Sequence, residues 1–184
     1  MRRSLVLDDA GDAGELLRPE HDAAERFARL GLDVDMASTS VVANLFRASG
    51  AARSNLERTV LAPEGLSFGA FTVLWVLWVW GETEFRHLAA DAGVTKGTLT
   101  GVVTTLERRD LVTRRRHDGD RRLMTVASTS EGDAVMARLF PRFNDGERRI
   151  VSGLDEAEAR QLAHLLRKVV RAVDGLDRNN GGLR

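Results

Sequence analysis

The segment from Phe85 to Val126 constrains the fold of this chain more than any other part of it. It begins with a short stretch of helical pattern, reaches Gly93 and Thr95, and continues into a longer helical pattern. Gly93 suits the positive φ that ends a helix at little cost. Thr95 can cap the next helix by accepting a hydrogen bond from a free backbone N–H. The segment therefore predicts two helices joined by a tight turn, which is a helix-turn-helix.

The second of these helices is predicted to have two different faces. One face is apolar at three- and four-residue spacing, which is typical of a helix with one buried side: Leu99, Val102, Val103 and Leu106. The opposite face combines small hydroxyls with long cations: Lys96, Thr98, Thr100, Thr104 and Arg108. Hydroxyls can reach base edges in a major groove and cations can meet phosphate, so we expect this face to contact DNA. An ordinary solvated helix surface is the alternative.

A basic hairpin is predicted directly after the second helix. Short β-prone runs at 111–114 and 123–126 flank a loop that contains Asp118-Gly119, a dipeptide favoured in hairpin turns. Cations on such a hairpin can follow a phosphate backbone or enter a narrow minor groove. Side chains alternate along a strand, so the three consecutive arginines 114–116 cannot all face one duplex. We expect one or two of them to contact phosphate, with Arg114 and Arg116 as the candidates, and the rest to pair with acids.

Taken together, these motifs resemble the core of the MarR family of winged-helix transcriptional regulators, over roughly residues 36 to 176. The residues that carry the resemblance are Leu88-Ala89, Thr95, Leu106-Glu107, Leu111-Val112, Arg114, Asp120-Arg121-Arg122, Thr129 and Gly132. Two positions depart from the family pattern. Asp110 stands where the family usually has a helix-ending Gly, and Ser128 stands where it usually has Leu. Asp tolerates the left-handed conformation better than most residues, so the first departure is mild.

The resemblance implies a mainly α fold with a small β-wing, in the α+β class. It implies a winged helix-turn-helix at 67–128 and a helical dimerisation region made of 36–66 and 129–176. A two-fold homodimer would place two recognition helices about one DNA turn apart on a palindromic operator, where the protein would act as a repressor. Within the wing, Arg121 and Arg122 are implied to contact DNA. Arg122 is the residue implied to enter the minor groove, with Asp120 bracing it through a salt bridge.

The rest of the chain reads as a series of helices. Pro19 to Leu30 and 36–61 have amphipathic patterns, and 68–80 is apolar nearly all round, which predicts a central helix buried on every side. Thr129 and Asp155 are expected to cap two further helices, and Pro141 should bend or split the first of them. Residues 1–35 are expected to form an acidic arm with a short helix, and 177–184 a frayed tail. Surplus amphipathic helices usually find a partner chain, most often a second copy.

A small-molecule effector is a further expectation from the resemblance. Family members commonly bind aromatic or anionic effectors between the dimerisation helices and the DNA-binding lobe. The candidate lining residues are Phe46, Phe71, Trp75 and Trp78. A plain core role is the commoner interpretation of such an aromatic cluster.

Composition and charge exclude several other classes of protein. The chain has 184 residues and no Cys, which excludes disulfides and thiolate metal sites. Its four His are dispersed, and no enzyme motif such as a P-loop or HExxH is present, so we expect neither a cofactor, a metal nor catalysis. Residues 86–122 contain nine Lys/Arg and five acidic residues, whereas residues 1–40 contain five Arg and nine acidic residues. This uneven distribution of charge fits an anionic partner that binds one face of the protein.

No apolar run of signal length follows Arg2-Arg3, and the 68–80 segment is too short to span a bilayer. A cytoplasmic protein that contacts no membrane is therefore expected. The second class of function left open is a winged helix that binds proteins, or DNA as an architectural module, without reading sequence.

Overall fold

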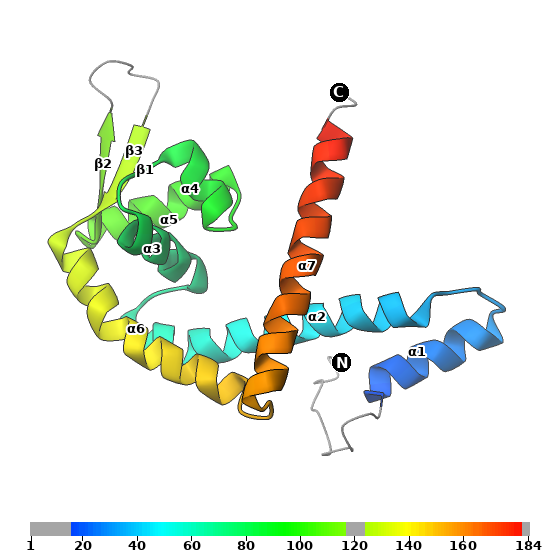
Figure 1. The fold of residues 1–184 in the computed structure, drawn as a ribbon. Coiled ribbons are helices and arrows are strands. Elements are labelled where there is room, and N and C mark those ends of the chain that lie inside the picture. Colours follow the sequence, from blue (N-terminus) through cyan, green and yellow to red (C-terminus); the bar gives the residue numbers. More distant parts are fainter. Residues whose placement is uncertain (1–15, 117–123, 182–184) are drawn as a thin grey trace, which may run out of the picture. The chain divides into compact units, whose positions relative to one another are not determined.

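The computed structural model describes residues 16–116 and 124–181. The chain divides into two compact units, Met1–Ala51 and Ala52–Arg184, and the boundary falls inside helix α2 (Met36–Leu56). Figure 1 shows the order of the elements along the chain.

The first unit contains α1 (Arg18–Arg29) and most of α2. Pro19 lies in the first turn of α1, and Gly31 follows the helix with a φ of 63°. Glu20 is buried, and its carboxylate accepts a hydrogen bond from the backbone N–H of Leu17 at 3.0 Å. Hydrogen bonds from Ser40 and from Leu17 are the largest causes that lower the pKa of Glu20, because they stabilise the charged carboxylate. The expected short helix before residue 35 is confirmed.

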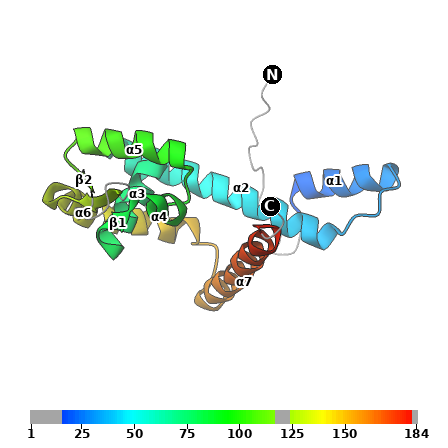
Figure 2. The ribbon, with the colours of Figure 1, turned by 90° about the horizontal axis from the view of Figure 1, so that it is seen from above.

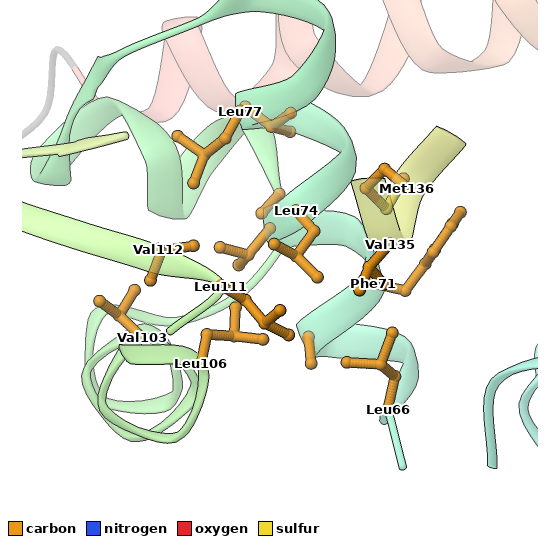
Figure 3. Packing of buried hydrophobic residues seen from close by; sticks show 14 of the residues in the cluster. Leu66, Phe71, Leu74, Leu77, Val103, Leu106, Leu111, Val112, Val135 and Met136 are labelled. Atoms are coloured by element: carbon orange, nitrogen blue, oxygen red, sulfur yellow. The ribbon is translucent and has the colours of Figure 1, made fainter. Parts of the chain in front are cut away.

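The second unit is built around α3 (Phe68–Trp80). The Ser67 hydroxyl caps α3 by accepting from the N–H of Ala70 at 3.2 Å. Figure 3 shows residues of α3, α5 (Lys96–Arg108) and α6 (Ser130–Ile150) that meet in the core. Among the core residues are Phe71, Val73, Leu74, Leu77, Leu99, Val103, Leu106, Val135 and Met136. Burying these apolar side chains is the main favourable contribution to the stability of this unit.

The prediction that α3 is buried on every side is wrong at its C-terminal end. Trp78, Val79 and Trp80 have exposed fractions of 36%, 48% and 58%. The ring of Trp78 packs against the ring of Phe140 in α6, and the two ring centroids are 5.7 Å apart. The apolar pattern alone could not distinguish the covered turns of this helix from the open last turn, because that depends on which elements reach it.

The small sheet has three strands in the order β1-β3-β2. The predicted hairpin is confirmed as β2 (Val112–Arg116) paired antiparallel with β3 (Met124–Ser128), with Arg114 opposite Val126. Figure 1 shows these two strands running side by side away from the helices. The sequence interpretation missed β1 (Thr83–Glu84), which pairs Thr83 with Val126. Two residues are too short a run to show an alternating pattern.

Helices α4 (Phe85–Asp91) and α5 form the predicted helix-turn-helix. Gly93 has a φ of 64° in the turn between them. The Thr95 hydroxyl accepts from the N–H of Thr98 at 3.1 Å, so the expected cap is confirmed. Between α2 and α3, the chain forms a π-helix (Glu57–Leu61), a 3-10 turn (Ala62–Glu64) and a turn at Gly65 with a φ of 65°.

The last two helices begin at their predicted caps. The Thr129 hydroxyl accepts from Gly132 N–H at 3.0 Å, and the Asp155 carboxylate accepts from Ala157 N–H at 2.7 Å. Pro141 does not split α6, which Figure 1 shows as one curved helix. Helix α7 (Glu156–Gly181) continues beyond residue 176, where a frayed tail was expected. Leu176 follows Val173 at helical spacing and extends the apolar stripe of α7.

Among the described residues, no single helix has the length and apolar composition needed to cross a membrane. The segments Met36–Glu64 and Phe68–Trp80 pass that test only as a bent pair.

Candidate nucleic-acid interface

Helix α5 presents one buried and one exposed face, as its sequence predicts. Leu99, Val103 and Leu106 are fully buried, and Val102 is half-buried. Figure 2 shows α5 along one edge of the second unit, with α3 and α4 on its inner side. All five residues proposed for DNA contact on this helix are exposed: Lys96, Thr98, Thr100, Thr104 and Arg108. Lys96, Thr100, Thr104 and Arg108 recur at four-residue spacing and so share one accessible side of the helix, whereas Thr98 lies about 160° from Thr100 around the axis.

The threonine hydroxyls on this face are bonded to the helix itself. Thr100 donates to the carbonyl of Lys96 at 3.1 Å, and Thr104 donates to the carbonyl of Thr100 at 2.8 Å. The Thr98 hydroxyl lies 2.9 Å from the Thr95 hydroxyl. With its hydrogen used in this way, a hydroxyl oxygen can still accept from an amino group of adenine or cytosine, and the methyl group can contact a thymine methyl.

Three further residues on the exposed face of α5 were not singled out from the sequence. Gly97, Gly101 and Thr105 are all exposed, and Thr105 donates to the carbonyl of Gly101 at 3.0 Å. A Cβ added at Gly101 would meet no atom within 4 Å. No packing contact within the protein therefore requires glycine there, although glycine in a helix interior costs about 1 kcal/mol relative to alanine. Plotting 96–108 on a helical wheel would have shown these residues beside the proposed contacts.

Arg114 forms an ion pair with Glu107 within the protein. Its Nε donates to Glu107 at 2.9 Å, its Nη2 is paired with the same carboxylate, and Nη2 also donates to the Thr104 hydroxyl at 3.3 Å. The hydrogen bond from Arg114 lowers the pKa of Glu107, and the carboxylate raises the pKa of the Arg114 guanidinium. Arg114 thus braces strand β2 against α5. The sequence interpretation had named Arg114 as a candidate for phosphate contact, whereas its guanidinium is paired with Glu107 in the structure. Contact of Arg114 with DNA stays a prediction.

Arg115 is exposed on β2, and Arg116 ends the strand. The side chain of Arg116 lies outside the part of the structure that is described. The same holds for Asp120, Arg121 and Arg122, so their proposed roles at the wing tip stay predictions.

The four aromatic residues suggested for an effector site differ in their surroundings. Phe71 is buried, and its ring stacks on Phe143 with centroids 4.1 Å apart. Trp75 is half-buried and meets Trp80 edge-on at 6.1 Å, while Trp78 lies beside Phe140. Phe46 is 73% exposed and belongs to the first unit. Phe71 is therefore a core residue, and the half-open Trp75 and Trp78 are the better candidates for contact with a ligand.

Within residues 16–116 and 124–181, no group of three His, Asp or Glu side chains is arranged to hold a metal ion.

Comparisons with known proteins agree with this geometry. Residues 66–124 match the model of the MarR family. The chain is 33% identical over 156 residues to the HTH-type transcriptional regulator YwaE of Bacillus subtilis, covering 84% of this chain and 91% of that protein. It is 30% identical to the HTH-type transcriptional repressor YetL of the same organism, covering 67% of this chain and 74% of that one.

A solved structure of Bordetella bronchiseptica BpsR, whose DNA binding is regulated by 6-hydroxynicotinic acid, has a TM-score of 0.66 and 25% identity. The match covers 71% of this chain and 98% of that one. The expected winged-helix fold is confirmed by this likeness and by the helices and sheet described above. The exposed threonine face of α5, the basic strand beside it and these relatives place the chain in the MarR family of helix-turn-helix transcriptional regulators.

Proposed function

We propose that the protein binds a short palindromic DNA operator as a homodimer and represses transcription by blocking polymerase there. The observation that carries this proposal is the exposed face of α5, where threonine hydroxyls lie between two cations, Lys96 and Arg108. The hydroxyls would read base edges in the major groove, and the cations would bind phosphates. The repressor role is supported by the likeness to the repressor YetL.

The homodimer is supported by an exposed apolar stripe on α7. Its members recur at three- and four-residue spacing and have exposed fractions of 37% to 58%: Leu162, Leu165, Leu166, Val170 and Val173. A helix with this pattern gains free energy when its stripe is covered, and a second copy is the commonest partner for such a helix. A two-fold dimer would then present two α5 helices to an inverted repeat.

A small aromatic acid is the proposed class of effector. The support is the relative BpsR, which responds to 6-hydroxynicotinic acid, together with the half-open aromatic rings of Trp75 and Trp78 in this chain. An effector that binds the DNA-free form better than the DNA-bound form would release the operator.

Selection of bound sequences from a random duplex pool tests the function. The purified protein is expected to enrich an inverted repeat and to bind it at least about a thousandfold more tightly than random DNA at physiological salt. Enrichment of no sequence, with equal affinity for all duplexes, would instead support an architectural or protein-binding winged helix.

Variants at α5 and at the wing assign the contacts. Lys96→Ala should weaken binding to all duplexes about equally and reduce the slope of log affinity against log salt concentration. Thr100→Ala should change the base preference at symmetric positions of the operator. Arg122→Ala should weaken binding of the selected duplex by at least about tenfold. Unchanged affinity of Arg122→Ala would contradict the role proposed for the wing.

A further inference from the structure

Arg109, directly after α5, holds the end of this helix to a turn that lies far away in the sequence. Its Nη1 donates to the carbonyl oxygen of Gly65 at 2.7 Å, and its Nη2 donates to the carbonyl oxygen of Glu64 at 3.0 Å. The planar guanidinium thus binds two consecutive carbonyls with two of its donors. An ammonium group, which is a single point of charge, cannot reproduce this forked geometry.

The turn that receives Arg109 is itself fixed. The N–H of Gly65 donates to Ala62 at 2.9 Å, and the N–H of Leu66 donates to Leu61 at 3.1 Å. The Glu64 carboxylate is also paired with Arg142 of α6 at 2.7 Å. The turn is therefore an anchor attached to α6 through a side chain, with backbone carbonyls free to receive Arg109.

The other contacts of α5 do not fully fix its orientation. Its buried face is made of Leu99, Val103 and Leu106, and apolar packing is not directional. The Arg114–Glu107 pair holds the helix to β2 on one side. Arg109 is the C-cap residue of α5, and its hydrogen bonds go to the Glu64–Gly65 turn and not to β2. Arg109 therefore restrains the end of α5 through a second contact, separate from the one with β2.

We propose that Arg109 is a positioning residue for operator recognition, which fixes the orientation of α5 through its two hydrogen bonds to the Glu64–Gly65 turn. The inference rests on the proposed function. Arg109 is exposed and follows Arg108 directly, so the alternative role is a direct contact of its charge with a DNA phosphate. The two roles differ in a measurable way. A phosphate contact contributes about 0.9 to the slope of log affinity against log salt concentration. A positioning residue instead changes how well α5 contacts the base edges, and so changes the ratio of affinities for the selected and the scrambled duplex.

The test compares Arg109→Ala, Arg109→Lys and Arg108→Ala in the full chain. Arg108 is the matched control, because it is an adjacent exposed arginine with no hydrogen bond or ion pair among the described residues. The probes are the duplex that the wild-type protein selects from a random pool and a scrambled duplex of the same composition. Affinity for both is measured over a series of salt concentrations, and thermal unfolding checks that each variant is folded.

Both Arg109 variants are expected to lower the ratio of selected to scrambled affinity by at least tenfold, with an unchanged salt slope. Arg108→Ala is expected to weaken binding to both duplexes with little change in the ratio of the two affinities. It should lower the slope by about 0.9 for each of the two chains on the duplex. If Arg109→Ala does not fold, Arg109→Lys carries the comparison, because it keeps the charge and loses only the forked geometry.

Two results would overturn the role of Arg109. One is a lower salt slope in Arg109→Ala that lysine restores, which would make the residue a phosphate contact. The other is wild-type discrimination in both variants. A wild-type protein that does not discriminate between the two duplexes would refute the proposed function itself, and the role of Arg109 with it.

Discussion

Asp110 occupies a backbone conformation that glycine adopts most easily. Its φ of 56° is the only positive value at a non-glycine residue within the described part of the chain. The turn is held on both sides, because the N–H of Asp110 donates to Glu107 at 3.0 Å and its carbonyl accepts from the Thr129 hydroxyl at 2.6 Å. The left-handed region is strained for residues with a Cβ, and less so for Asp.

Replacing Asp110 therefore gives opposite results for two small residues. Asp110→Gly is expected to raise the free energy of unfolding by about 0.5 kcal/mol, because the strain of the Cβ disappears. Asp110→Ala should lower it by about 1 kcal/mol, because alanine lacks the tolerance of Asp for this region. Urea denaturation measures both changes. Equal stability of the glycine and alanine variants would contradict the argument.

Gly101 offers a test of why the side of α5 that we propose to face DNA contains glycine. Gly101→Ala should raise the free energy of unfolding by up to about 1 kcal/mol, because alanine favours a helix and its Cβ meets no atom within 4 Å. The same methyl group would stand on the face that approaches the base pairs, so affinity for the selected duplex should fall by about tenfold, near the cost of one mismatched contact.

The control for this change is Gly50→Ala in α2, where an added Cβ also meets nothing within 4 Å. It should stabilise the protein without weakening DNA binding. Calorimetry and a duplex titration measure the two properties separately. If Gly101→Ala binds the selected duplex as tightly as the wild-type protein, close approach of the helix backbone is not required.

The contact between α5 and β2 depends on the ionised form of Glu107. Because the folded protein lowers the pKa of Glu107 below its ordinary value of 4.5, this contact stabilises the fold fully above that pH. The stabilisation is lost as the pH falls through the lowered pKa. Glu20 and Asp35 also have lowered pKa values and contribute to acid sensitivity in the same direction.

Glu107→Gln removes the pH-dependent part of this contact. The variant is expected to lose roughly 0.5 kcal/mol of stability at pH 7, a small value because the pair is partly exposed. Between about pH 5 and pH 3 its stability should fall less steeply than that of the wild-type protein. Chemical denaturation across this pH range measures the difference, with Asp91→Asn at an exposed carboxylate of α4 as the control. Parallel curves for the wild-type protein and Glu107→Gln would contradict the assignment.

Assembly of two chains is the largest change that the proposed function requires. Leu166 lies in the exposed apolar stripe of α7, whereas His164 lies on the other side of the same helix. Leu166→Asp should abolish the dimer, since a charge in the stripe would have to be buried on association. His164→Asp should leave the dimer intact.

Size-exclusion chromatography with light scattering on the eluted protein gives the mass of each species. The wild-type protein and His164→Asp are expected at twice the chain mass of 20.3 kDa, and Leu166→Asp at the chain mass itself. The monomeric variant should also lose most of its affinity for an inverted repeat, because one recognition helix reads only half of it. A wild-type monomer that still discriminates among duplexes would contradict the two-fold arrangement.

Local patterns in the sequence were enough to predict most of the elements and the exposed face of α5. The caps at Thr95, Thr129 and Asp155 and the positive φ of Gly93 depend on neighbours within a few residues, so the sequence predicts them directly. The periodicity of α5 likewise determines which of its residues are buried and which are exposed.

Contacts between distant parts of the chain could be established only from the tertiary structure. The sequence shows a basic wing, but only the fold assigns Arg114 to Glu107 and brings Arg109 to a turn 44 residues earlier. It also decides that the last turn of α3 is open, although its composition is as apolar as that of the buried turns. The physical reason is that hydrogen bonds and burial depend on which surfaces meet, whereas capping and helical periodicity depend on residues that are adjacent along the chain.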